Sequence, residues 1–445
     1  QGNDGGIGRS SSQGTSSKLV AVAESRRMFR KVVLNNGIRV VAERMPATRS
    51  VTLGIWVNVG SRDEQPGEEG VSHFIEHMAF KGTRRRSAAQ ISREIDSLGG
   101  EMNAFTTRET TAFYVKVVDE HLRPACALLA DLFYGSRFEP KEVEKEKLVV
   151  LEEIRMIQDD PEDLLHDLHI KHQLQRHPLG KPIVGEPATI KRFKRDFLLG
   201  YVARHYVPHQ TVLAVAGAFE WKSLVPVLEA SFGSVERKAN GQRVQRWPAA
   251  VGSGLLVQRR SLEQVHLCFG LKGVSIDHKD RYAAHVLNAA LGGGVSSRLF
   301  QRIREERGLA YSIYSYLSGY SDTGMLAIYA GTSPRQAPRV VELACRELRR
   351  VRRTGLDRKE LERAKNQLKG GLMLSLESTH SRMHKLAKEE LYHGRHSTLQ
   401  ELLADIDRVS AAQVARLAQD LLDPRSLSLT VLGPVSRRTI QGALN

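Results

Sequence analysis

Residues 138–145 read Phe-Glu-Pro-Lys-Glu-Val-Glu-Lys, and residues 356–363 read Leu-Asp-Arg-Lys-Glu-Leu-Glu-Arg. The two segments begin 218 positions apart and place charged and apolar residues alike. Three further pairs recur at a similar separation: Cys126 with Cys345, residues 51–59 with 265–273, and residues 110–118 with 325–330. An internal repeat of this length predicts two copies of one fold, each of about 200 residues.

Local patterns in the first copy predict a mixture of helices and strands. Two β-rich runs, 32–34 and 38–42, flank Asn35-Asn36-Gly37, which is typical of a β-hairpin. The run Ser87-Ala-Ala-Gln90 is a capping box that begins a helix, and Gly99-Gly100 ends it. Because hairpins alternate with helices, we expect an α+β fold of two homologous domains with antiparallel-rich sheets packed against helices.

The composition excludes several classes of protein. With 41% hydrophobic and 26% charged residues, the chain is an ordinary globular protein rather than a disordered tail or a coiled coil. It has no run of about 18 apolar residues, so we expect no membrane span. The net charge of +16 permits nucleic-acid binding, but no zinc-finger spacing accompanies it, and we expect no nucleic-acid partner. Three cysteines in 445 residues predict a reducing compartment.

The sharpest chemical feature is the run His73-Phe-Ile-Glu76-His77. On a helix, His73 and His77 are four residues apart and share a face, so both imidazoles can bind one metal ion. Glu76 reaches the same face and can take the proton of a metal-bound water. This is the logic of a zinc peptidase in which the usual order of the motif is reversed. The alternative is an amphipathic helix with two surface histidines.

A catalytic zinc site needs a third protein ligand and an open position. Glu146, Val150 and Glu153 recur at helical spacing within residues 141–157 and share one stripe. A stripe that carries a valine should face inward, and a carboxylate there needs a partner such as a cation. The alternative is that these glutamates lie on the surface of a helix rich in Glu and Lys.

The stretch from His73 to Thr83, His-Phe-Ile-Glu-His-Met-Ala-Phe-Lys-Gly-Thr, closely resembles the motif of the pitrilysin/insulinase family of inverted-motif zinc peptidases. It is most similar to bacterial processing-peptidase-like proteins and to the catalytic subunit of mitochondrial processing peptidase. Residues 99–108 and 177–180 match the same family. The resemblance covers nearly the whole chain. It implies two similar α/β domains that face each other across a cavity, with one zinc ion per chain bound in the first domain.

The resemblance also assigns catalytic roles. The third zinc ligand of the family lies 76 residues after the second histidine, which is Glu153 here. Glu146 matches a glutamate that supports the site, and Glu76 is then the general base. In the second domain, Arg304 and Tyr311 match a pair that binds the substrate carbonyl or the oxyanion.

Substrate-binding residues are implied in the same way. Asn103 and Ala104 match an edge strand to which an extended peptide adds as a further strand. Phe80 matches a residue that lines the pocket just after the scissile bond. Asp163 and Asp167 match acids that bind an arginine near the cleavage site, and the alternative is that they only favour the start of a helix.

Two further patterns resemble ligand sites but are interpreted otherwise. His166, His169 and His172 recur every three residues, which turns them around a helix, so we interpret them as surface residues. The run Gly292-Gly-Gly-Val-Ser-Ser297 lacks the Lys-Ser/Thr of a phosphate-binding loop, so we expect no nucleotide.

These patterns divide the chain into four parts. Residues 1–27, rich in Gly, Ser and Gln, are expected to be a disordered leader or tag, or else a cleaved targeting peptide. Residues 28–236 form the zinc-bearing catalytic domain, residues 237–254 the linker, and residues 255–445 a homologous second domain. That domain should bind no metal, because Asn288-Ala-Ala-Leu-Gly replaces the zinc motif and Gly371 stands at the repeat of position 153.

We therefore expect a zinc-dependent endopeptidase that cleaves extended peptides or presequence-like segments. The alternative is a non-catalytic structural or partner subunit of the same fold. Since one chain carries both the zinc motif and the Arg304–Tyr311 pair, we expect a homodimer, or a heterodimer with a related subunit. The expected location is the bacterial cytoplasm, or the mitochondrial matrix if the leader is a transit peptide.

Overall fold

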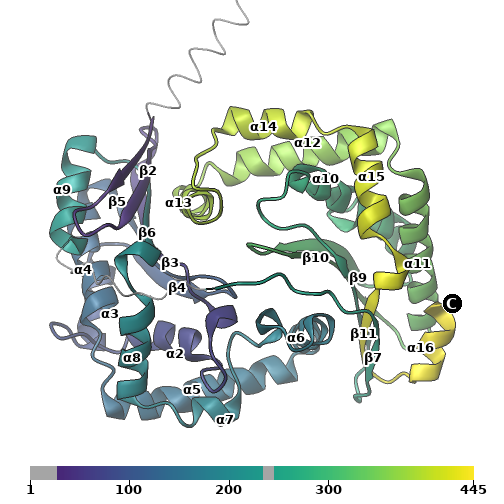
Figure 1. Ribbon diagram of the computed structural model, residues 1–445, viewed down its shortest axis with the longest axis horizontal. Coiled ribbons are helices and arrows are strands. Elements are labelled where there is room, and N and C mark those ends of the chain that lie inside the picture. Colours follow the sequence, from purple (N-terminus) through teal and green to yellow (C-terminus); the bar gives the residue numbers. More distant parts are fainter. Residues whose placement is uncertain (1–27, 234–244, 445) are drawn as a thin grey trace, which may run out of the picture.

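The computed structural model describes residues 28–233 and 245–444, which form two halves of similar architecture (Figure 1). The predicted leader, residues 1–27, lies outside the described residues, and so do residues 234–244, which include the first part of the predicted linker, 237–254. Helix α9 (Trp221–Phe232) is the last element of the first half, and strand β7 (Gly254–Gln258) is the first element of the second. None of the described helices is long and apolar enough to cross a membrane.

Each half is built on one mixed sheet. The strand order is β1-β2-β6-β3-β5-β4 in the first sheet and β7-β11-β8-β10-β9 in the second. Strands β7, β11, β8, β10 and β9 of the second sheet correspond in order to β2, β6, β3, β5 and β4 of the first. In each sheet the first two of these strands are parallel: β2 with β6, and β7 with β11. The strands are β1 (Phe29–Val33), β2 (Arg39–Arg44), β3 (Ser50–Val57), β4 (Glu101–Thr106), β5 (Thr111–Val118), β6 (Thr211–Gly217), β8 (Val265–Lys272), β9 (Ser312–Gly319), β10 (Gly324–Thr332) and β11 (Ser428–Leu432). The repeat of one α+β fold that the sequence predicts is confirmed.

Helices cover these sheets, and the local signals in the sequence mark where they begin. Ser87 caps α3 by accepting a hydrogen bond from the Gln90 backbone N–H, as the capping box predicts. Strands β1 and β2 pair antiparallel, as the predicted hairpin requires. The remaining helices are α2 (Val71–Ala79), α3 (Ala88–Ser97), α4 (Leu122–Gly135), α5 (Pro140–Asp159), α6 (Pro161–Leu174), α7 (Pro187–Ile190), α8 (Arg195–His205), α10 (Arg281–Gly292), α11 (Ala337–Thr354), α12 (Arg358–Ser375), α13 (Thr379–Lys388), α14 (Leu399–Asp407), α15 (Ala411–Leu421) and α16 (Arg437–Leu444).

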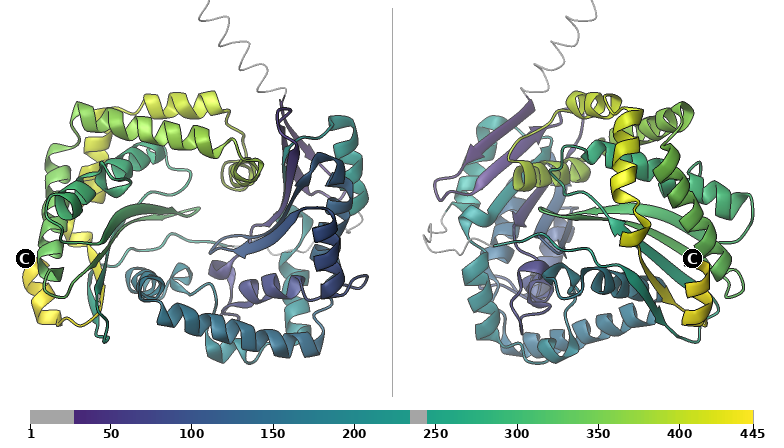
Figure 2. Two further views of the ribbon diagram at one scale, coloured as in Figure 1. Left: turned by 180° about the vertical axis from the view of Figure 1, so that it is seen from behind. Right: turned by 45° about the vertical axis from the view of Figure 1, so that its right-hand side comes forward.

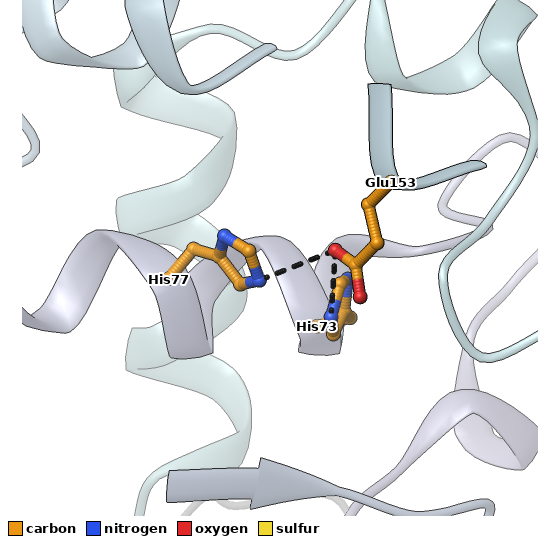
Figure 3. Close-up of side chains that lie close together, drawn as sticks. All are labelled: His73, His77 and Glu153. Atoms are coloured by element: carbon orange, nitrogen blue, oxygen red, sulfur yellow. Dashed lines mark ion pairs between the residues drawn. The ribbon is translucent and has the colours of Figure 1, made fainter. Parts of the chain in front are cut away.

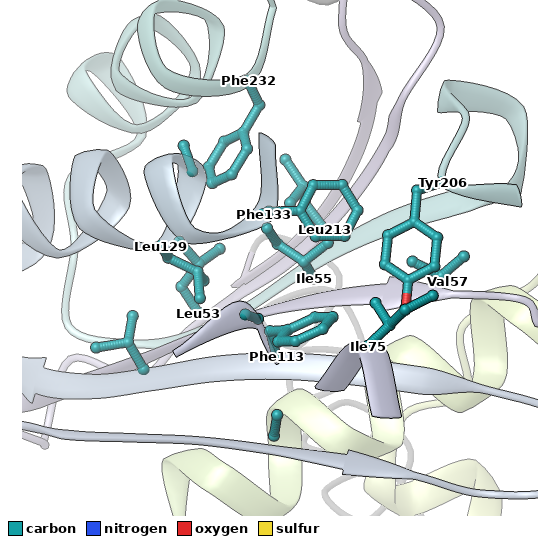
Figure 4. Close-up of a cluster of buried hydrophobic side chains, with 14 of the residues drawn as sticks. Leu53, Ile55, Val57, Ile75, Phe113, Leu129, Phe133, Tyr206, Leu213 and Phe232 are labelled. Carbon is teal, nitrogen blue, oxygen red and sulfur yellow. The ribbon is translucent and has the colours of Figure 1, made fainter. Parts of the chain in front are cut away.

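The core of the first half lies between its sheet and the helices on one face (Figure 4). Leu53, Ile55 and Val57 alternate along β3 and pack in one cluster with Leu129 and Phe133 of α4. The three β3 side chains are fully buried. Full burial of an aliphatic side chain contributes about 1.5–3 kcal/mol, so this face of β3 fixes the register of the sheet against its helices.

One helix of each half packs on the sheet of the other half. Helix α13 of the second half packs on β2, β3 and β6 of the first sheet, and α6 of the first half packs on β8 and β11 of the second (Figures 1 and 2). Trp56 Nε1 on β3 donates to Met383 Sδ on α13 at 3.2 Å. Helices α6 and α13 directly follow α5 and α12, which correspond to each other in the internal repeat. The two halves therefore exchange equivalent helices. Separating the halves would expose one face of each sheet.

The prediction that His166, His169 and His172 lie on the surface is wrong. His169 is fully buried and the other two are half-buried, because α6 lies on the second sheet. His169 Nδ1 and His172 Nδ1 lie 3.0 Å and 3.2 Å from Thr430 Oγ1 of β11. His166 contacts tyrosine hydroxyls of β9, including that of Tyr316 at 2.9 Å. These histidines pack between the halves.

Acidification is expected to weaken this contact through His169. Burial lowers the pKa of His169 to about 3, and the neighbouring His172 and His166 lower it further, whereas an unfolded histidine titrates near 6.5. The unfolded chain therefore binds a proton that the folded chain does not, and stability falls as the pH falls from 6.5 toward 3. Between pH 7 and pH 5 this one group should lower the free energy of unfolding by about 2 kcal/mol.

Urea titrations of the parent and of His169→Asn at pH 7 and pH 5 measure this effect. Asparagine keeps a polar atom near the position of Nδ1 but does not titrate. The stability loss between the two pH values should therefore be smaller in the variant by about 2 kcal/mol. An unchanged loss would mean that other groups cause the acid sensitivity.

Candidate metal centre and peptide-binding edge

Helix α2 carries both histidines of the motif and begins after Gly70. This glycine has a left-handed φ of +90°, and a Cβ there would lie 2.7 Å from the Cα of Gly185. Only glycine fits both the conformation and the close approach. Phe74, Ile75 and Met78 on α2 are fully buried in the core of the first half, which turns His73 and His77 toward α5.

His73, His77 and Glu153 form a compact group whose ligand atoms all lie within 4.8 Å of one another (Figure 3). Glu153 Oε2 lies 3.6 Å from His73 Nε2 and 3.5 Å from His77 Nε2. This oxygen is buried and has no hydrogen-bond partner among the residues that the structure describes. Tetrahedral ligands at about 2.1 Å from a zinc ion are separated by about 3.4 Å, so the three atoms fit one zinc ion. In the described part of the chain, no other group of three His, Cys, Asp or Glu side chains brings its ligand atoms this close together.

Glu146 orients one of the two imidazoles. It is buried on the inward stripe of α5, as the helical spacing predicts, and its Oε1 lies 2.9 Å from His77 Nδ1. Lys81 Nζ pairs with the other oxygen at 2.7 Å. A carboxylate that holds the Nδ1 proton leaves Nε2 free to bind a metal, which is the usual arrangement around metal-binding histidines. Lys81 lies in the stretch 73–83 that resembles the family, but no role was predicted for it.

The electrostatic environment differs between the two histidines. Burial lowers the pKa of His73 to about 4, so its imidazole is neutral at pH 7, the form that binds metals. For His77, burial lowers the pKa, but the hydrogen bond to Glu146 and the charge of Glu153 outweigh it and raise the pKa overall. A metal ion in this group therefore competes with a proton on His77.

Glu76 lies beside the group of three but outside it. Its Oε2 accepts a hydrogen bond from Thr106 Oγ1 at 2.7 Å, which joins α2 to the end of β4. Burial raises the pKa of Glu76, against the hydrogen bond from Thr106 and the charge of His77. A carboxylate with a raised pKa suits a general base that works near neutral pH. Thr106 lies in the stretch 99–108 that resembles the family, but no role was predicted for it.

Strand β4 is the edge of the first sheet and contains Asn103 and Ala104. Among the described strands it pairs only with β5, antiparallel, so its other side has no neighbouring strand. The Ala104 backbone N–H donates to Asn103 Oδ1 at 2.8 Å. Phe80 follows α2 directly and packs, half-buried, in the same small cluster as Met102 of β4. Glu76 is thus bonded to the end of the edge strand through Thr106 and lies on the same helix as the two histidines.

Arg304 and Tyr311 form no hydrogen bond or ion pair with this group among the described residues. Tyr311 is 78% exposed, and its ring lies 5.9 Å from the Arg304 guanidinium. Within the described residues, no hydrogen bond or ion pair joins either side chain to the first half. The role predicted for this pair stays a prediction.

The acidic stretch forms the start of α6. Asp160 caps the helix by accepting the backbone N–H of Asp163, which is exposed. Asp167 Oδ1 lies 3.9 Å from Arg108 Nη2, a partner that the sequence did not suggest. Binding of a substrate arginine by Asp163 and Asp167 stays a prediction.

Comparison with known proteins identifies the family. The family models described as "Insulinase (Peptidase family M16)" and "Peptidase M16 inactive domain" match residues 39–186 and 192–368. The chain is 43% identical over 407 residues to the "Uncharacterized zinc protease YmxG" of Bacillus subtilis, covering 92% of this chain and 98% of that one. It is 39% identical over 442 residues to a protein of Mycobacterium leprae with a similar name, covering 97% and 98% of the two chains.

Solved structures show the same fold at lower identity. The crystal structure of a protease from Helicobacter pylori matches with a TM-score of 0.84 at 21% identity, covering 91% of this chain and 99% of that chain. A peptidase M16 inactive domain from Pseudomonas fluorescens matches with a TM-score of 0.86 at 18% identity, covering 92% and 98%. The family resemblance predicted from residues 73–83 is thus confirmed over nearly the whole chain, which belongs to the insulinase family of peptidases, M16.

Proposed function

We propose that this protein is a zinc-dependent endopeptidase that cleaves extended peptides. The observation that carries the proposal is the buried Glu153 Oε2. It has no hydrogen-bond partner in the described part of the chain and lies about equally far from the Nε2 atoms of His73 and His77. These three side chains would hold the zinc ion and leave a fourth position open. When bound, zinc supplies Lewis-acid polarisation of a carbonyl and makes water more acidic.

Residues of this chain would bind the substrate, transfer the proton and stabilise the oxyanion. A substrate segment would pair with the edge of β4 beside Asn103 and Ala104. The contact of Glu76 with Thr106 of the same strand supports this, since the peptide would then run close to Glu76. Glu76 would take a proton from the attacking water and pass it to the leaving amine. The Tyr311 hydroxyl and the Arg304 guanidinium of the second half would donate hydrogen bonds to the oxyanion.

The substrate would be an extended, presequence-like segment. Main-chain pairing at β4 accepts many sequences, so side-chain preference would come from Phe80 after the scissile bond and from Asp163 and Asp167. A substrate arginine would have to replace Arg108 as the partner of Asp167. We further propose a bacterial cytoplasmic location, which the three buried free cysteines favour, and a homodimer or a heterodimer with a related subunit.

Cleavage of a quenched peptide, measured together with metal content, tests the proposal. The purified protein should cleave the peptide, lose activity with a chelator and regain it with zinc. Elemental analysis after removal of adventitious ions should give one zinc per chain, because Asn288 and Gly371 replace ligands in the second half. Cleavage that survives complete removal of metal, or two tightly bound ions per chain, would contradict it.

A further inference from the structure

Three consecutive charged side chains stand immediately before the metal-binding helix. Arg62 and Asp63 belong to a single helical turn, Ser61–Asp63, and Glu64 follows it. All three residues are buried, although charged side chains are rarely buried without partners. Each of the three contacts a different part of the molecule.

Arg62 reaches the second half. Its Nη1 pairs with Glu109 Oε1 at 2.6 Å, and its Nη2 pairs with Asp322 Oδ2 at 2.5 Å. Asp322 lies in the turn between β9 and β10, and the neighbouring Ser321 donates its backbone N–H and its hydroxyl to Glu109. The side chains of Arg62 and Glu109 are each 2% exposed, so this ion cluster between the halves is shielded from solvent.

Asp63 binds the segment that leads into the second half. Its two carboxylate oxygens accept hydrogen bonds from Arg246 Nε at 3.0 Å and Arg246 Nη2 at 2.7 Å, a two-point contact. Arg246 also donates to the backbone carbonyl of Glu109 at 2.9 Å. The ion cluster therefore includes the chain between the halves as well as the β9–β10 turn.

Glu64 holds the start of α2. One of its oxygens accepts the backbone N–H of Gly70 at 2.8 Å, and the other accepts that of Ser72 at 2.9 Å. Backbone N–H groups at a helix start have no partner within the helix, and a buried carboxylate that satisfies two of them fixes where the helix begins. Ser72 directly precedes His73, so Glu64 also fixes the position of the first histidine of the motif.

We propose that Arg62, Asp63 and Glu64 are positioning residues that couple the placement of α2 to the docking of the second half. The β9–β10 turn that binds Arg62 is continuous with β9, and Tyr311 directly precedes that strand. One short segment thus links the metal-binding helix to the strand that bears Tyr311. The significance of this coupling for peptide cleavage rests on the proposed function, but the coupling itself is a property of the folded chain.

The test removes one contact in the half that holds no metal ligand. Asp322→Asn keeps the shape of a partly exposed side chain and removes the charge that pairs with Arg62. Glu43→Gln is the matched control, because it breaks another ion pair between the halves, with Arg382 of α13, that does not touch the Ser61–Asp63 turn. Hydrogen exchange of residues 71–79 in the metal-free protein and zinc affinity in a chelator competition are measured for both variants.

In Asp322→Asn we expect exchange of α2 to rise and zinc affinity to fall, each by roughly threefold to thirtyfold, as for other coupled networks. Glu43→Gln should match the parent in both measurements, and Asp322→Glu should restore most of the parent's values. If Asp322→Asn does not fold, Arg62→Lys replaces it with the same expectations.

The outcomes separate this proposal from the proposed function. Exchange of α2 that is unchanged in Asp322→Asn, or raised equally in Glu43→Gln, overturns the coupling. A parent protein that neither binds zinc nor cleaves peptides would overturn the proposed function, while the exchange measurement would still decide the coupling.

Discussion

Replacing Glu76 by glutamine is expected to lower kcat for peptide cleavage by about 10²- to 10⁴-fold while zinc stays bound. Glutamine is close in shape to glutamate, so α2 and both imidazoles should stay in place. Its side-chain oxygen can still accept the hydrogen bond that Thr106 Oγ1 gives to Glu76. The amide cannot take the proton of the attacking water. Kinetics with a quenched peptide and metal analysis on the same preparation measure both quantities.

Glu152→Gln serves as the control for this variant. Glu152 lies on α5 next to Glu153, but it is exposed and pairs with Arg155. Its replacement should leave both activity and zinc content at the level of the parent. A Glu76→Gln protein that retained more than about a tenth of the parent's activity would show that Glu76 is not the general base.

Replacing Glu153 by glutamine is expected to abolish activity for a different reason, the loss of zinc. Glu153 supplies the one anionic atom of the group of three, and an amide oxygen is a much weaker ligand. Removing a residue that merely supports a ligand costs about 10- to 100-fold in metal affinity, so loss of the ligand itself should cost more than about 100-fold. Chelator competition measures the affinity directly.

Both variants should therefore be inactive in a peptidase assay. In a metal assay, Glu76→Gln should retain zinc and Glu153→Gln should lose it. Adding excess zinc should recover part of the activity of Glu153→Gln and none of that of Glu76→Gln. If Glu153→Gln bound zinc as tightly as the parent and as Glu152→Gln, the third ligand would have to be another carboxylate, with Glu146 nearest at hand through its contact with His77.

Much of the candidate site was predictable because its signals are local. Four-residue spacing on a helix brings His73 and His77 together, and the stripe of Glu146, Val150 and Glu153 places both glutamates toward α2. The same holds for the capping box of Ser87, which begins a helix whatever surrounds it. Such features depend on backbone geometry over a few residues.

The repeat was also readable from the sequence, because copies of one fold keep similar residues at similar places. It predicted which strands and helices correspond, and the two strand orders agree with it. The sequence of β3, residues 50–57, forms a strand that the structure buries on both faces. What covers the second face could not be read from it.

Tertiary structure alone decided which surfaces meet. Helical periodicity shows that α6 has an inward face but not that this face meets the other half, and for that reason the buried His169 was misplaced. Arg62, Asp322 and Arg246 are distant in sequence, and nothing in their spacing joins them, yet they form one buried cluster. The sequence by itself determined the two-copy α+β fold through its long-range repeat, and it placed His73 and His77 on one helix face through short-range geometry. The choice of Glu153 as third ligand came from the family resemblance. The exchange of α6 and α13 and the burial of His169 depend on long-range packing, which a local pattern does not specify.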